Sequence, residues 1–201
     1  WNGNLAHLDD LRLVQLQLHP NEWFARHARR LLQERSAHGK DLRPAHAKLR
    51  DILRNHAETH VKLRALWSLH ATGGLDEPRL LQQLTHPQEN IRAWAIKLLC
   101  ENPPSDKALA QLQRLATNGD SPLVRLHLAS ALQRIQPDKR WPLAEALIAH
   151  SQDADDPNLP LLYWYGIEPL VHTDPSRFVT LAAKTQIPLL RQFITRRVAE
   201  R

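Results

Sequence analysis

The feature that most constrains the fold is an arginine that recurs inside similar amphipathic segments. Five segments align on it: WFARHARRLL, HVKLRALWSLH, ENIRAWAIKLL, PLVRLHLASAL and PLLRQFITRRV. Their arginines are Arg26, Arg64, Arg92, Arg125 and Arg191, at intervals of 38, 28, 33 and 66 residues. The last interval is twice 33, and a sixth copy, NLPLLYWYGIEPL, fills it with Leu162 in the arginine's place. A repeat of about 30 to 40 residues is typical of stacked helix pairs.

A shorter apolar pattern precedes each of these segments and has the spacing of a second helix. In KALAQLQRLA, for example, Leu109, Leu112 and Leu115 lie on one helical face. Turn residues such as His86-Pro87 separate the two patterns, and none of the segments alternates apolar and polar residues with period 2. The sequence therefore predicts an all-α fold, a right-handed α-solenoid of about six antiparallel helix pairs, and the pairs resemble HEAT repeats.

We expect a single HEAT-like repeat domain over residues 1–201. Its approximate repeats are 5–37, 41–74, 75–102, 104–136, 138–172 and 174–201. Gly is scarce at 6 and Pro is frequent at 14, which suits helices with sharp ends better than β-hairpins. No apolar run approaches the roughly 20 residues that a membrane span requires. Because the chain contains no Met, we interpret it as a processed chain or, preferably, a fragment, and its localisation is unknown from these residues.

The recurring arginines are interpreted as structural residues of the repeat. Asn21 precedes Arg26 by five residues, and Asp120 precedes Arg125 by the same interval. At this spacing a turn carboxylate or amide can accept hydrogen bonds from the guanidinium of its own or a neighbouring repeat. HEAT repeats, which this pattern resembles, carry such a ladder between a turn acid and an arginine of the second helix. The predicted ladder comprises Arg26, Arg64, Arg92, Arg125, Arg191 and Asp120.

Three further arginines, Arg29, Arg30 and Arg35, do not recur and form a candidate basic face. Residues 1–64 hold 12 Lys and Arg against 7 Asp and Glu, whereas residues 65–136 hold 7 against 6 and residues 137–201 hold 8 against 8. The face is either an ordinary solvated surface or an electrostatic binding site. Because the positive excess ends after residue 64, a continuous basic track is lacking, and nucleic-acid binding is only the alternative function.

The remaining polar motifs predict no catalytic, cofactor or metal site. In HAETH, residues 56–60, two histidines lie one helical turn apart, but no third metal ligand accompanies them. The acidic cluster DADD, residues 153–156, is interpreted as a solvated turn with helix caps rather than a calcium loop. Cys100 is the only cysteine and lies in the apolar run IKLLC, so we predict that it is buried. We therefore expect no enzyme activity from these residues alone.

The segment DDPNLPLLYWYGIEPLV holds the candidate interface. Its three successive aromatic residues, Tyr163, Trp164 and Tyr165, point in different directions around a helix and cannot all face one core. A helix that is apolar nearly all round needs cover on more than one side. We predict that Tyr163 or Tyr165, together with Leu159, contributes to an exposed patch that docks a neighbouring domain. The alternative is an unusually thick internal core at the fifth repeat.

Several strings also resemble one family as a set. They are LHPNEWFARHARRLLQER (18–35), LRALWSLHATGGL (63–75), IRAWAIKLLCE (91–101), SPLVRLHLASALQR (121–134) and DDPNLPLLYWYGIEPLV (155–171). Together they resemble the HEAT-repeat segment of PVC-type haem-binding, membrane-bound dehydrogenase proteins. In that family a β-propeller precedes the helical repeats, and a cytochrome c domain with a CxxCH motif follows them.

The resemblance has implications beyond these 201 residues. It implies a parent protein with haem c in another domain, neighbouring domains of the same chain as partners, and a periplasmic or other extracytoplasmic location. This sequence contains neither CxxCH nor a propeller, so the haem ligands and catalytic residues of such a parent would lie elsewhere.

Three functions are compared on this basis. The preferred one is a non-catalytic scaffold that links the catalytic and cytochrome c domains of a larger dehydrogenase-like protein, the parent being the oxidoreductase. The alternative is a nucleic-acid-binding HEAT-like domain that uses the basic N-terminal face. The third is a HEAT-like enzyme similar to the phycobilin lyases, for which no specific residue is found.

Overall fold

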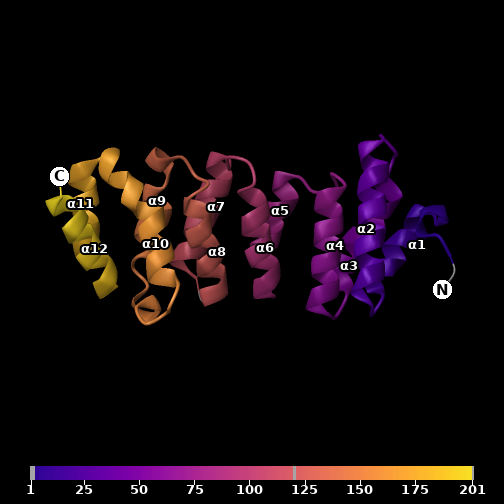
Figure 1. The fold of residues 1–201 in the computed structure, drawn as a ribbon, viewed down its shortest axis with the longest axis horizontal. Coiled ribbons are helices and arrows are strands. Elements are labelled where there is room, and N and C mark those ends of the chain that lie inside the picture. Colours follow the sequence, from indigo (N-terminus) through magenta and orange to yellow (C-terminus); the bar gives the residue numbers. More distant parts are fainter. Residues whose placement is uncertain (1–2, 120, 201) are drawn as a thin grey trace. The chain divides into compact units, whose positions relative to one another are not determined.

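The fold is a succession of short helices. The computed structural model describes residues 3–119 and 121–200, and these residues form helices and no strand, which confirms the predicted all-α class (Figure 1). The α-helices are α1 (Asp10–Gln15), α2 (Glu22–Ala37), α3 (Arg43–Asn55), α4 (Thr59–Ala71), α5 (Glu77–Gln83), α6 (Glu89–Leu99), α7 (Asp106–Thr117), α8 (Pro122–Leu132), α9 (Trp141–Leu147), α10 (Leu159–Ile167), α11 (Pro175–Lys184) and α12 (Pro188–Ala199). Short 3-10 helices are η1 (Leu5–His7), η2 (Leu16–Leu18), η3 (Pro137–Lys139), η4 (Ser151–Asp153) and η5 (Glu168–His172).

Local sequence signals explain where many of these helices begin and end. The side chains of Asn21, Ser105 and Asp174 accept backbone N–H groups in the first turns of α2, α7 and α11, at 2.9, 3.1 and 2.9 Å. These caps satisfy donors that have no partner within the helix. After α2 and α4 the chain reverses at Gly39 and Gly73, whose φ angles of 77° and 72° favour glycine.

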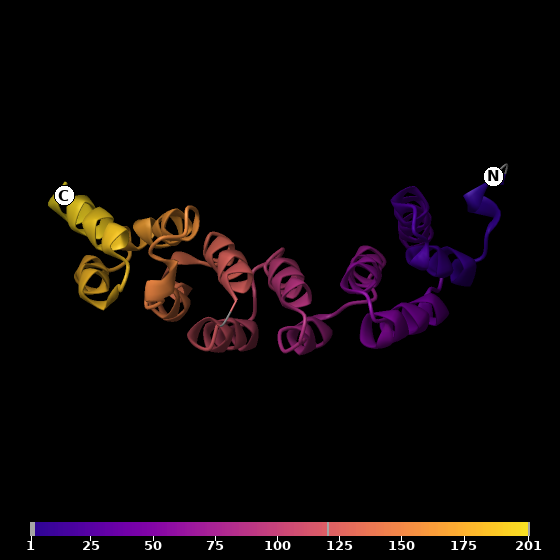
Figure 2. The ribbon, with the colours of Figure 1, turned by 90° about the horizontal axis from the view of Figure 1, so that it is seen from below.

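The contacts divide the chain into two compact units, residues 1–79 and 80–201. In the first unit α1 packs on α2 and α3, and α4 packs on α2 and α3. Figure 2 shows α2 and α4 on one side of this unit and α1 and α3 on the other. Side chains with no exposed surface fill its core: Leu13, Val14, Ala25, Leu32, Leu49, Leu66 and Leu69. The division into six repeats within one domain stays a prediction.

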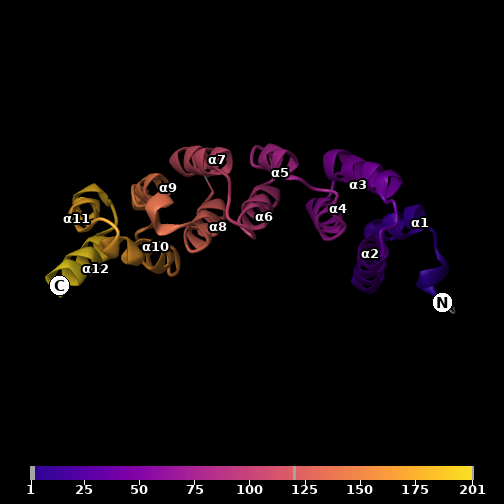
Figure 3. The same ribbon diagram turned by 90° about the horizontal axis from the view of Figure 1, so that it is seen from above.

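In the second unit, α6, α8, α10 and α12 pack side by side in succession, and α7 packs on α9. Figure 3 shows these two rows of helices, with α11 continuing the row of α7 and α9. The core between the rows includes Ile91, Ile96, Leu112, Leu128, Leu132 and Phe178, all without exposed surface. Burial of apolar side chains, worth about 25 cal/mol per Å² removed from water, is the main term that stabilises such stacking.

A glycine allows α10 to approach α8 closely. A Cβ atom at Gly166 would lie 2.6 Å from Leu132 Cδ1 and 2.8 Å from Leu132 Cβ, which is closer than carbon atoms pack. The missing side chain thus permits the contact between the two helices that shapes the surface described next.

Candidate partner-docking surface

A buried ion pair joins α8 to the turn that precedes α10. Arg125 donates from Nε and Nη2 to Asp153 Oδ2 and Oδ1 at 2.7 and 2.5 Å, and from Nη1 to the Gly119 carbonyl at 3.1 Å. The Tyr163 hydroxyl donates to the same carboxylate at 2.6 Å. Arg125 and Asp153 are 3% and 2% exposed, and Tyr163 is fully buried. The three side chains therefore satisfy one another away from water.

This network is a structural tie rather than an acid–base site. The hydrogen bonds that Arg125 donates to Asp153 raise the pKa of Arg125, and burial, followed by the Asp153 carboxylate, raises the pKa of Tyr163. Both groups consequently keep their protons at neutral pH, and the two-pronged guanidinium–carboxylate geometry is among the strongest that side chains form.

The inward direction of Tyr163 decides which side of α10 reaches solvent. Residues two positions away in an α-helix are rotated by about 200° and therefore point the opposite way. Leu161 and Tyr165 accordingly face outward, with 39% and 58% of their surface exposed. Trp164 is half-buried, and its ring centroid lies 5.4 Å from that of Phe193 in α12.

The predicted interface on this segment requires a correction. Leu159 and Tyr163 are buried, so the prediction that they contribute to an exposed patch is wrong. The physical reason is the Asp153 carboxylate, which draws the Tyr163 hydroxyl inward and so fixes the rotation of α10. Tyr165 is exposed, and Leu161 rather than Leu159 accompanies it.

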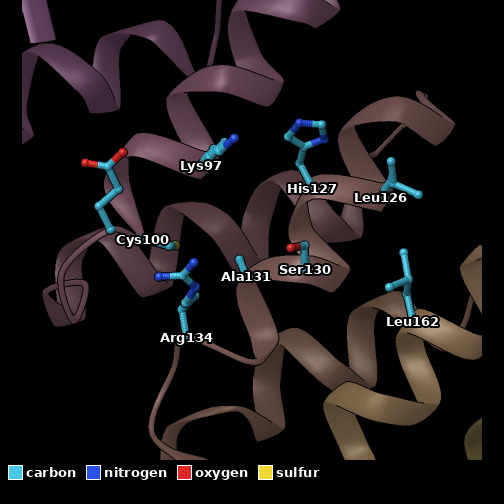
Figure 4. Close-up of a pocket in the computed structure, with 9 residues that line it drawn as sticks. Lys97, Cys100, Leu126, His127, Ser130, Ala131, Arg134 and Leu162 are labelled. Atoms are coloured by element: carbon cyan, nitrogen blue, oxygen red, sulfur yellow. The ribbon is translucent and has the colours of Figure 1, made fainter. Parts of the chain in front are cut away.

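Next to these two residues, Leu162 lines a groove between α10, α8 and α6. The groove has a volume of about 360 Å³. Its lining residues are Lys97, Cys100, Glu101, Leu126, His127, Ser130, Ala131, Arg134 and Leu162. Figure 4 shows Leu126 and Leu162 at one end of the groove and Cys100 and Arg134 at the other. We call this groove, together with Leu161 and Tyr165, the docking face.

The rim of the groove carries cationic side chains. Lys97 Nζ lies 4.5 Å from the centroid of the Trp94 ring, and Arg134 is exposed just after α8. His127 is half-buried, and its burial, helped by the charge of Lys97, lowers the pKa of its imidazole. His127 is thus a neutral donor and acceptor near pH 7, close to the positive charge of Lys97.

The cysteine in the groove is not a nucleophile at neutral pH. Cys100 is 3% exposed, and burial raises the pKa of its thiol to about 11 despite the nearby charge of Arg134. The thiol therefore stays protonated, whereas reactive cysteines have lowered pKa values. Cys100 acts as a small apolar residue of the groove floor.

The other recurring arginines bind backbone carbonyls at turns. Arg64, 5% exposed, donates to the carbonyls of Gln17 and His19 at 3.0 and 2.9 Å and pairs with Glu22. Arg92 donates to the carbonyls of residues 86 and 87 at 2.7 and 3.0 Å. Arg191 donates to the carbonyls of residues 182 and 185 at 3.1 and 3.0 Å.

Two members of the predicted ladder need separate treatment. Arg26 does not share the arrangement, because its side chain is 70% exposed and pairs with Glu22, one turn earlier in the same helix, at 3.5 Å. The structural role predicted for Arg26 is therefore wrong, and the neighbouring Glu22 is used by Arg64 instead. Asp120 lies outside the described residues, so its predicted pairing with Arg125 stays a prediction. Among the described residues, Arg125 binds the carboxylate of Asp153.

The candidate basic face does not form a shared surface. Arg35 donates to Asp10 at 2.5 Å and to the carbonyls of Ala6 and Leu8 at 2.9 and 2.7 Å, which fixes the N-terminal segment against α2. Arg29 is half-buried with its guanidinium carbon 5.5 Å from the centroid of the Trp67 ring. Only Arg30 is exposed, beside Glu34 at 3.2 Å. The prediction of a common face is wrong because two of its members are held in the fold.

Sequence reasoning missed two buried charged residues in the second unit. The sequence predicts that Asp153 belongs to a solvated acidic cluster, which is wrong because the residue is buried against Arg125, 28 residues earlier. Arg140 is 8% exposed and donates to the carbonyls of Ile135 and Gly166 at 2.8 and 3.0 Å. Neither belongs to a recurring position, so the repeat pattern contains no signal for them.

Metal and membrane features are not found in the described part of the chain. Residues 3–119 and 121–200 contain no cluster of three His, Cys, Asp or Glu side chains that could hold a metal ion. Of the two histidines in HAETH, His60 is exposed and lies 3.2 Å from the carboxylate of Glu58. None of the described helices is long and apolar enough to cross a membrane.

Comparison with known proteins identifies the repeat type. Residues 77–158 match the family described as HEAT repeats, and this match supports a HEAT-repeat protein and an all-α solenoid. The matched residues include α6 and α8, which form two walls of the groove. No curated protein and no solved structure matches the chain.

Proposed function

We propose that this chain is a non-catalytic helical-repeat scaffold that binds a neighbouring domain or another protein through the docking face. The observation that carries the proposal is the exposure of Leu161 and Tyr165 beside the groove. Both residues lie within about 100° of Leu162 around the helix, so the patch and the groove adjoin. Exposed apolar side chains that adjoin a hollow are typical of interaction sites, and Tyr is favoured there.

The chemistry of the groove supports a binding role over a catalytic one. Cys100 is held protonated, and the nearby buried groups Arg125 and Tyr163 are occupied by Asp153. The groove thus offers no activated nucleophile at neutral pH. HEAT repeats generally act as scaffolds, which agrees with this interpretation.

We also propose a partner for the scaffold. The repeats would link the catalytic and cytochrome c domains of a larger dehydrogenase-like protein with an extracytoplasmic location. The resemblance of the repeat strings, above all DDPNLPLLYWYGIEPLV, supports this assignment. Haem c and the oxidoreductase chemistry would then belong to the other domains of the parent.

The alternative of nucleic-acid binding has little support. It depended on a cluster of free arginines in the first unit, whereas Arg35 is bound to Asp10 and two carbonyls and Arg29 lies against Trp67. Nucleic-acid binding requires several cations that are free to contact phosphates.

A site-specific photo-crosslinker tests the scaffold. A benzophenone amino acid is introduced at Tyr165 in the parent protein and, as a matched control, at the exposed Gln113 of α7. We expect a crosslink from position 165 to a propeller or cytochrome c domain, or to a separate protein, and none from position 113. Equal crosslinking from both positions, or none from either, would contradict the proposal.

A further inference from the structure

The side chains that line the groove include more basic than acidic residues, and this imbalance would favour some protein partners over others. Three of its lining residues, Lys97, His127 and Arg134, are basic, and Glu101 is the one acidic lining residue. Lys97 lies over the Trp94 ring and Arg134 is exposed after α8, whereas Glu101 has an interaction of its own, so positive charges outnumber negative ones on the lining. The cations at the rim therefore have charge to offer to a ligand.

The floor of the groove has the opposite character. Leu126, Ala131 and Leu162 are apolar, and Cys100 is neutral because its pKa is raised to about 11. The volume of about 360 Å³ falls within the range of sites that enclose small ligands, about 300–1,000 Å³. A bulky apolar side chain fits this floor, whereas a phosphate would meet apolar carbon there and lose its hydration.

The outward side of α10 extends the same surface. Leu161 and Tyr165 are exposed and adjoin Leu162 at the end of the groove, so an extended or helical segment that fills the groove would also cover them. Cations above an apolar floor complement acidic residues next to apolar anchors, and such complementarity increases both specificity and the association rate.

We propose that the docking face binds an acidic segment of a partner protein, with a bulky apolar side chain in the groove and carboxylates against Lys97 and Arg134. This inference rests on the proposed scaffold function and specifies the chemistry of its partner. His127, facing Lys97 across the groove, would donate a hydrogen bond to the same segment.

A phage-displayed library of random short peptides, selected on the immobilised chain at low salt, is the probe. We expect the selected peptides to be rich in Asp and Glu next to Leu, Phe or Trp. On the double variant Lys97→Glu with Arg134→Glu, we expect the acidic peptides to be lost. The matched control is Arg114→Glu on the exposed side of α7, which should leave the selection unchanged. Circular dichroism verifies that each variant is folded.

Affinity of one selected peptide, measured by fluorescence anisotropy, gives the second readout. The double charge reversal should weaken its Kd by about tenfold or more, and added salt should weaken the wild-type complex as well. Failure to enrich any sequence, a consensus without acidic residues, or a consensus that survives the double variant would overturn the inference. Binding of a single-stranded oligonucleotide that displaces the peptide and depends on both cations would assign the groove to nucleic acid and overturn it too.

The outcomes separate this inference from the scaffold proposal. A neutral or basic consensus that is lost in Leu161→Ser with Tyr165→Ser would leave the docking face in place and reject only the acidic partner. An absence of crosslinks from position 165 in the parent would reject the scaffold proposal, whatever the peptides show.

Discussion

Arg64 in the first unit and Arg125 in the second occupy the same place in the repeat but are held in different ways. Arg64 donates to two backbone carbonyls and pairs with Glu22, a side chain that is 38% exposed. Arg125 donates to one carbonyl and to Asp153, which is 2% exposed and also binds Tyr163. Both arginines are buried, but the carboxylate that pairs with Arg64 reaches solvent, whereas the one that pairs with Arg125 does not.

The difference shows that the same recurring residue can contribute different amounts to the free energy of unfolding in different repeats. A buried ion pair costs desolvation of both charges, so its removal is harmful mainly when one charge is left behind. An arginine whose carboxylate partner is partly exposed leaves a charge that can turn to water when the arginine is removed. The two units should therefore respond differently to the same substitution.

The largest effect is expected for Arg125→Ala. It leaves Asp153 buried without its counter-ion, and loss of one partner of a buried pair costs about 3–5 kcal/mol in the free energy of unfolding. Urea denaturation followed by circular dichroism measures it. As the control, the triple variant Arg125→Met, Asp153→Leu and Tyr163→Phe removes the three buried polar side chains together and should recover most of the loss. An unchanged urea midpoint for the single variant would refute the structural role of the Arg125–Asp153 pair.

A smaller effect is expected for Arg64→Ala, about 1–3 kcal/mol, because two carbonyls lose a charged donor while Glu22 can turn to solvent. Amide hydrogen exchange near η2 should accelerate, since Arg64 holds the carbonyls of residues 17 and 19. The matched control is Arg26→Ala, for which an exposed pair predicts about 0–0.5 kcal/mol. Equal losses for the two variants would mean that burial does not distinguish these arginines.

Removal of a single hydroxyl sharpens the comparison. Tyr163→Phe keeps the ring in the core and the Arg125–Asp153 pair intact but deletes the hydrogen bond of 2.6 Å. We expect a loss of about 1–2 kcal/mol in the free energy of unfolding. Faster hydrogen exchange in α10, without a change in α4, would be the accompanying sign. A loss as large as that of Arg125→Ala would show that the hydroxyl, not the ion pair, dominates.

The smallest expected effect is a pH dependence that both units share. Burial lowers the pKa of His46 in the first unit and of His127 in the second. In the unfolded chain these imidazoles take a proton near pH 6.5, whereas in the folded chain they take it only at a lower pH. Stability is therefore fully present above about pH 6.5 and decreases as the pH falls below it. The double variant His46→Gln with His127→Gln should flatten the change in urea midpoint between about pH 7.5 and 5.5.

The fold could be predicted because it depends on a periodic signal. The recurring arginine and the apolar spacing are local, and the helices and their caps follow from them. The site depends on pairings that no period reveals. Asp153 and Arg125 are 28 residues apart, and the rotation of α10 follows from that carboxylate rather than from the YWY sequence itself. The hydrogen bonds of Arg35 cannot be predicted from the sequence for the same reason, because its acceptors are 25 to 29 residues away.

The copy of the repeat that lacks the arginine illustrates a division of labour between neighbours. At the arginine's position α10 has Leu162, and the turn that leads into α10 is held by Arg125 of the preceding copy. Because Arg125 stabilises this turn, α10 needs no arginine at the equivalent position, and Leu162 lines the groove instead. In an array of this kind, a repeat whose turn is stabilised by the arginine of its neighbour can use its own equivalent position to bind a partner.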